Sequence, residues 1–166
     1  MSSRRIHLPG LVLLGLLAAV TGAWAQSQAH ITLQSLAEVE QTVLDQEGRS
    51  SVKRVPATKV TPGTEVIFTI LYENVSQQAV ENAVITNPIP EQMLFREGSA
   101  GGGGALITYS VDHGQSYDLP AKLFLQDQAG RKFPARAQDY THVRWTFETP
   151  LPPGAKGEVS FRAVLK

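Results

Sequence analysis

The segment 110–117 (SVDHGQSY) concentrates side chains whose types and spacing could do local chemistry. Asp112 stands two residues after one serine and four residues before another. In a tight turn, aspartate and serine side chains hydrogen-bond to nearby backbone groups, and glycine supplies positive φ where the turn requires it. We therefore expect a structural hairpin turn with an aromatic ring packed beneath it. Its residues are Ser110, Asp112, Gly114, Ser116 and Tyr117.

A calcium or sugar site is the alternative for this segment. Calcium takes about six to eight oxygen ligands, whereas Asp112 and the nearby Asp118 supply two carboxylates. The spacing resembles the Asp-box, an S-x-D-x-G-x-[ST]-[WY] hairpin found in sialidase-like propellers and in other β proteins. That resemblance implies a fold-stabilising turn. We expect changes at Asp112 to lower stability without removing a metal or sugar affinity.

Other candidate catalytic and metal-ligating residues are scattered along the chain. The sequence has no cysteine, which excludes thiolate nucleophiles, disulfides and Cys-ligated zinc. It has no G-x-S-x-G elbow, and its acidic residues show no spacing that forces two carboxylates together. We expect no enzyme activity, no metal and no cofactor. The sequence has four histidines with no metal-binding spacing: His7, His30, His113 and His142. His7 lies in the N-terminal segment that we expect to be removed, and we expect the other three to be solvated.

The charge balance argues against nucleic acid as a partner. The chain carries 15 Lys and Arg against 15 Asp and Glu, and it contains no long basic run. Binding to phosphate backbones depends on clustered Lys and Arg. We therefore expect no nucleic-acid binding.

Residues 1–25 have the layout of a secretory signal peptide. Arg4 and Arg5 precede an apolar run over 11–20, and small residues end the segment at 23–25 (AWA). A transmembrane anchor is the alternative, but a membrane span needs about 20 apolar residues, roughly twice this run. We expect cleavage after Ala25 and a periplasmic or secreted mature chain, 26–166, with no membrane span.

The mature chain reads as an all-β domain. Val143, Trp145 and Phe147 alternate with polar residues, as in antiparallel strands with one face on a core. Apolar residues on both faces of 65–73 predict a central strand. Frequent turns indicate a single immunoglobulin-like antiparallel β-sandwich of about eight strands. The expected strands are 31–44, 50–56, 65–73, 79–86, 104–111, 121–126, 142–148 and 159–166. The expected core anchors are Phe68, Trp145, Phe147 and Phe161.

Two expected loops complete this pattern. Four consecutive glycines, 101–104, predict a flexible surface connector because glycine disfavours regular structure through its backbone entropy. The triplet Asn74-Val75-Ser76 fits a glycosylation site, but so short a match is usually due to chance. We interpret it as the mark of an exposed turn.

Several segments in order resemble a known bacterial family. They are 60–70 (VTPGTEVIFTI), Asn74, 83–90 (AVITNPIP), 98–100 (GSA), Trp145, 151–154 (LPPG) and 159–161 (VSF). Over roughly residues 56–166 they resemble the conserved cell-envelope repeat domain catalogued as domain of unknown function family eleven. The resemblance implies an immunoglobulin-like sandwich in exported or surface proteins, usually in tandem copies, with no established enzyme activity. The chain departs from that pattern in its single copy, in Asn87, where an Asp often precedes the proline, and in its extension 26–55.

Two functions from different classes remain open. The first is an exported, non-catalytic interaction or structural module that engages another envelope or surface protein through sheet edges or long loops. The second is a carbohydrate-binding module, suggested by Tyr109, Tyr117 and Tyr140 near expected loops. Sugar platforms need exposed, coplanar aromatic rings, so the exposure of these three tyrosines separates the two hypotheses.

Overall fold

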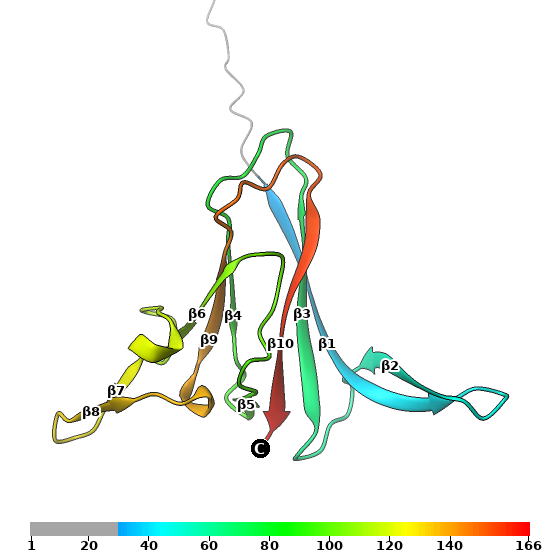
Figure 1. Cartoon of the computed structure of the whole chain (residues 1–166), viewed down its shortest axis with the longest axis horizontal. Coiled ribbons are helices and arrows are strands. Elements are labelled where there is room, and N and C mark those ends of the chain that lie inside the picture. The colour runs from blue at the N-terminus through cyan, green and yellow to red at the C-terminus, as the bar shows by residue number, and fades with distance from the viewer. Residues whose placement is uncertain (1–29) are drawn as a thin grey trace, which may run out of the picture.

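The computed structural model describes residues 30–166, which form ten β-strands and two short 3-10 helices (Figure 1). The all-β class and the antiparallel sheets predicted from the sequence are confirmed. The expected signal peptide, 1–25, and its cleavage after Ala25 lie outside the described residues. The elements are β1 (Ile31–Leu44), β2 (Ser50–Pro56), β3 (Glu65–Asn74), β4 (Val84–Pro88), β5 (Met93–Phe95), β6 (Leu106–Ser110), η1 (Pro120–Lys122), β7 (Phe124–Gln126), β8 (Lys132–Pro134), η2 (Ala137–Asp139), β9 (His142–Thr146) and β10 (Lys156–Leu165).

The strands form three antiparallel sheets. A five-stranded sheet has the order β2-β1-β3-β10-β5, a three-stranded sheet has the order β4-β9-β6, and β7 pairs with β8 alone. β3 lies in the middle of the larger sheet, as its two apolar faces predict. Val66 and Ile70 are buried on one of its faces, and Ile67 is buried on the other. The strand count exceeds the expected eight because β5 and β8 are three-residue strands too short for an alternating pattern.

One apolar core joins the five-stranded and three-stranded sheets, an arrangement consistent with a β-sandwich. Trp145 on β9 is fully buried and lies 6.4 Å, centroid to centroid, from Phe161 on β10. Phe147 is also buried and meets the ring of Tyr72 edge-on. Phe68 is half-buried and stacks on Phe161 at 5.0 Å. Three of the four expected core anchors thus belong to one core, and Phe68 packs against it.

The glycine segment differs from the flexible connector that its composition predicted. Gly101 exchanges two backbone hydrogen bonds of 2.9 Å with Ser160 on β10, and its carbonyl accepts a bond of 3.1 Å from the Trp145 indole N–H. A Cβ added to Gly102 would lie 2.5 Å from Cγ1 of Val159. Glycine therefore permits a close approach of this loop to the sheet.

The segment after Asn74 is exposed, as expected, with Val75 at 50% exposure, but the expectation is wrong for Asn74 itself. Asn74 is fully buried, and its amide donates bonds of 2.8 Å to the carbonyls of Gln78 and Leu151. Its side-chain oxygen accepts from the backbone N–H and the hydroxyl of Ser76. The side chain thereby satisfies polar groups of two loops, which explains its burial.

Candidate interaction surface

The segment 110–117 forms one hydrogen-bonded turn at the end of β6. The hydroxyl of Ser110 donates to Asp112 at 2.7 Å, and the backbone N–H groups of Gln115 and Ser116 bond to the same carboxylate at 3.0 and 2.9 Å. Gly114 has φ +85°, and its N–H bonds to the Ser110 hydroxyl. The structure therefore brings the polar residues of the expected turn together.

The carboxylate of Asp112 is committed to this turn. The hydroxyl of Ser116, its backbone N–H and the hydroxyl of Ser110 hold the pKa of Asp112 well below its usual value. Among residues 30–166, no group of three or more His, Asp or Glu side chains could hold a metal ion. The hydrogen bonds of Asp112 therefore stabilise the turn itself.

Tyr117 lies between this turn and β9. The guanidinium carbon of Arg144 lies 3.4 Å from the centre of the Tyr117 ring, a cation–π geometry. His142 meets the same ring edge-on at 6.4 Å and shares a 3.2 Å hydrogen bond with the hydroxyl of Thr141. Burial lowers the pKa of His142, with a further contribution from His113. The expectation of a fully solvated histidine is wrong for His142, which is half-buried.

The other two tyrosines belong to the core. Tyr109 and Tyr140 are 8% and 9% exposed, and their rings stack 4.6 Å apart. Neither offers a face to solvent, so the observation that suggested carbohydrate binding does not hold for this pair. The sequence did not separate them from loop aromatics because each lies at the edge of a turn.

A hairpin of mostly exposed residues, which we call the β1–β2 arm, spans residues 39–55. Residues 31–38 of β1 pair with β3, and residues 38–44 pair with β2. The strand thus leaves the sandwich and continues as a two-stranded ribbon, seen at the right of Figure 1. On the opposite side, β7 and β8 form a second, shorter projection, which we call the β7–β8 arm, residues 124–134.

The outer edge of β2 carries unpaired backbone groups. At one end of the β1–β2 pairing the N–H of Ala57 donates to the carbonyl of Ala37, and at the other end the N–H of Asp45 donates to the carbonyl of Arg49. Hydrogen-bonded pairs alternate along an antiparallel ladder, so between these ends the odd-numbered residues of β1 and β2 bond to each other. Lys53 therefore directs its backbone N–H and C=O groups toward β1, whereas the even-numbered residues of β2 direct theirs away from β1. Those residues are Ser50, Val52 and Arg54. Within residues 30–166, no strand pairs with this side of β2.

An ionic network holds the base of the β1–β2 arm. The guanidinium of Arg162 on β10 binds Glu40 at 2.8 Å and Glu65 at 2.7 Å. Arg96 pairs with the same Glu65, and Arg54 lies 3.9 Å from Glu40. The bond from Arg162 lowers the pKa of Glu40 below its usual value. These contacts tie the arm to the side of the sandwich and fix its direction.

The face formed by even-numbered residues of this arm carries two exposed apolar side chains. Leu44 is 71% exposed, and Val52 is 64% exposed. Both lie on one face of the ribbon because β1 and β2 pair with Thr42 opposite Val52 and Leu44 opposite Ser50.

Both arms end in the same turn, D-Q-x-G-R, at 45–49 and at 127–131. In each, the aspartate accepts from two backbone N–H groups and from the arginine Nε, at 2.8 Å for Arg49 and 2.7 Å for Arg131. The glycines have φ +80° and +81°. Four of the five positions are identical in the two segments, a repeat that could have been found in the sequence.

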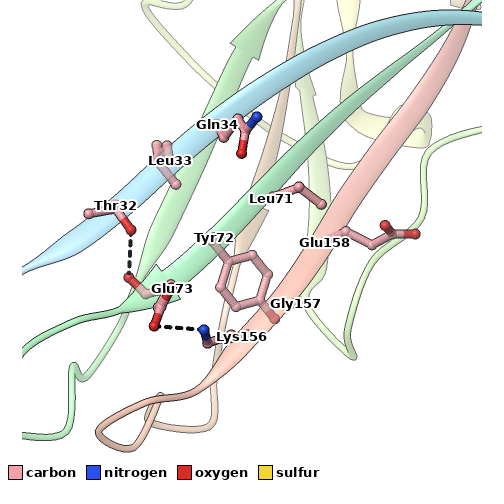
Figure 2. A pocket seen from close by; sticks show the side chains of 9 residues that line it. All are labelled: Thr32, Leu33, Gln34, Leu71, Tyr72, Glu73, Lys156, Gly157 and Glu158. Atoms are coloured by element: carbon pink, nitrogen blue, oxygen red, sulfur yellow. Dashed lines mark hydrogen bonds and ion pairs between the residues drawn. The ribbon is translucent and has the colours of Figure 1, made fainter.

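A shallow hollow of about 600 Å³ lies across β1, β3 and β10, close to the start of β1 (Figure 2). Lys156 pairs with Glu73 at 3.0 Å, and the Thr32 hydroxyl donates to the Glu73 carbonyl. The lining also includes Leu71 and Glu158. Its charged groups are paired or lie at the rim, and they form no set of convergent catalytic side chains.

Comparisons of the chain with protein-family models, curated proteins and solved structures found no match. The resemblance to the envelope repeat domain therefore stays a prediction. In the part of the chain that the structure describes, no helix is long and apolar enough to cross a bilayer. Fold and surface together define an all-β protein with antiparallel sheets and an uncovered sheet edge on a projecting arm.

Proposed function

We propose that this chain is an exported, non-catalytic, immunoglobulin-like module that binds another protein of the bacterial envelope by strand addition to β2. The observation that carries the proposal is the outward-directed backbone of Ser50, Val52 and Arg54. In strand addition, main-chain hydrogen bonds provide affinity, and few special side chains are needed.

Two of the other sheet edges, those of β5 and β6, are less open than the outer edge of β2. β5 has three residues and contacts η2, and Tyr109 of β6 exchanges backbone bonds of 3.0 and 3.1 Å with Asp118. β2 has seven residues on an arm that stands clear of the sandwich. An exposed edge of this kind is a template for another strand.

The local hydrogen bonds of the polar side chains also favour a binding role over catalysis. Asp112 and Ser116 bond to each other within their turn, and His142 bonds to Thr141. These groups already have local partners, whereas a nucleophile needs a general base within hydrogen-bond reach.

The immunoglobulin-like and export parts of the proposal rest on separate features. Two antiparallel sheets share a core around Trp145, as in sandwiches of this class. The basic, apolar and small-residue layout of 1–25 favours secretion.

A proline scan of the arm tests the proposed edge. Val52→Pro removes an outward N–H, while the bonds of Lys53 and Ser51 to β1 can remain. Thr42→Pro is the matched control because Thr42 lies opposite Val52 but directs its N–H to the other edge of the arm. Envelope proteins retained by the immobilised wild type and by Thr42→Pro, but lost with Val52→Pro, are the expected result. Equal retention by Val52→Pro would contradict it.

A further inference from the structure

We propose that β2 pairs antiparallel with β2 of a second copy of this chain, with Val52 opposite Val52, so that two five-stranded sheets become continuous. The inference rests on the proposed strand addition and assigns a second copy of the chain to the same edge. It requires an edge whose backbone, charges and side chains complement themselves under two-fold symmetry.

The backbone satisfies this requirement. A two-fold axis at Val52 places Ser50 of one copy opposite Arg54 of the other, and Ser51 opposite Lys53. Ser50, Val52 and Arg54 all direct their N–H and C=O groups outward, as derived from the pairing of β2 with β1. Each pair among them is therefore of the hydrogen-bonded type.

The charges of β2 favour this register over the two registers in which the axis lies one residue away. With the axis at Val52, every cation of β2 faces a serine. Moving the axis to Lys53 places two lysines directly opposite each other and pairs Ser50 with Pro56, which has no N–H. Moving it to Ser51 places Arg49 opposite Lys53. Like charges directly opposite each other destabilise a strand pair.

The exposed apolar side chains fit the same register. Val52, at 64% exposure, meets its counterpart across the axis and is flanked by Thr42 on β1 of each copy. Cross-strand pairs of β-branched residues stabilise antiparallel sheets. The pairing therefore covers apolar surface that the monomer leaves in solvent.

The arm itself gains support from a second copy. An isolated two-stranded ribbon is marginally stable in water, whereas three or more strands sustain each other. Pairing converts the ribbon into four strands over 50–54. The ionic contacts of Arg162 with Glu40 already fix the direction of the arm at its base, so a partner meets a preset edge.

Cysteine cross-linking tests the register directly because the chain has no cysteine of its own. In a hydrogen-bonded pair the Cα atoms lie about 5.5 Å apart, within the disulfide range of about 4.4–6.8 Å. In the purified, exported protein, we expect Val52→Cys to oxidise to a covalent dimer. Ser50→Cys alone should not, but a mixture of Ser50→Cys with Arg54→Cys should cross-link. Equal rates for Val52→Cys and Ser50→Cys alone would overturn the register.

Sedimentation over a concentration series tests the pairing without cross-links. We expect a wild-type monomer–dimer equilibrium that Val52→Pro weakens about tenfold or more, since two hydrogen bonds are lost at the axis, while Thr42→Pro leaves it unchanged. Ser50→Lys, opposite Arg54, should weaken the dimer, and Ser50→Glu should strengthen it. Melting curves would confirm that each variant is folded.

The outcomes separate this inference from the proposed function. A wild type that stays monomeric at all concentrations, but whose retention of another envelope protein still depends on Val52, would overturn self-pairing and leave strand addition standing. A Val52→Pro variant that changes neither self-association nor retention would overturn both.

Discussion

The β1–β2 arm and the β7–β8 arm have the same turn but different attachments. Asp45 and Asp127 fix their turns through equivalent bonds to Arg49 and Arg131. The β1–β2 arm continues a five-stranded sheet, whereas the β7–β8 arm is a separate two-stranded sheet. The shared turn thus sets the register within each hairpin. Whether the hairpin extends a larger sheet depends on its first strand, because β1 also pairs with β3 whereas, within residues 30–166, β7 pairs only with β8.

The exposed side chains of the two arms differ accordingly. Phe124 and Phe133, at 50% and 44% exposure, stand on opposite faces of the β7–β8 arm. On the β1–β2 arm, Leu44 and Val52 share one face. A face with aligned apolar residues next to an open backbone favours pairing with another strand, and the β7–β8 arm lacks that combination.

The largest expected effect comes from the core on which both arms depend. Trp145→Ala should lower the free energy of unfolding by about 3–5 kcal/mol, as for other buried aromatics. Leu44→Ala, on the exposed arm, should change it by less than about 0.5 kcal/mol. Urea unfolding of both variants measures the difference. An unchanged midpoint for Trp145→Ala would contradict the core assignment.

The shared turn allows a direct comparison of the arms. Gly48→Ala and Gly130→Ala each place an L-residue at positive φ, which costs about 1–2 kcal/mol. Because β7 and β8 pair over three positions and β1 and β2 over seven, the same penalty should open the β7–β8 arm more completely. Amide exchange at Phe133 and Lys53 measures this. Equal opening of both arms would show that strand length does not matter.

The stability that the 110–117 turn gives to the fold should depend on pH. Hydrogen bonds from Ser116 and the backbone lower the pKa of Asp112, so its ionised form stabilises the fold above the ordinary pKa of 3.8. That stabilisation is lost as pH falls through the lowered value. Melting of wild type and Asp112→Ala should differ most above about pH 5 and converge in acid. Calcium should shift neither curve, and a calcium-dependent gain only in wild type would indicate a metal site.

The smallest expected effect concerns the base of the β1–β2 arm. Arg162→Met removes the bonds to Glu40 and Glu65, but all three side chains are partly exposed. Solvent screens such pairs, so global stability should fall only slightly. Amide exchange in β2 should increase more than in Arg131→Met, where a tip contact is lost. Greater exchange in β2 for Arg131→Met would contradict this role of Arg162.

The sequence predicted the strands whose faces are decided by local alternation. Trp145 and Phe161 alternate with polar residues, and both are buried. Tyr109, Tyr140 and Asn74 were misread because their burial depends on contacts between segments that are distant in the sequence. The projection of the arm could not be predicted from the sequence either. It arises because β1 changes partner from β3 to β2 near residue 38, and the residue types on the two sides of this point do not indicate the change.

The central claim, that β2 is an edge open to another strand, is tested most directly by amide exchange at neighbouring residues of β2. The N–H of Lys53 points to β1 and should be protected at every protein concentration. The N–H groups of Val52 and Arg54 point outward, so they should exchange freely in dilute protein and become protected as concentration rises. Free exchange of Val52 at every concentration would contradict pairing between copies, and protection of Val52 in dilute protein would contradict the open edge.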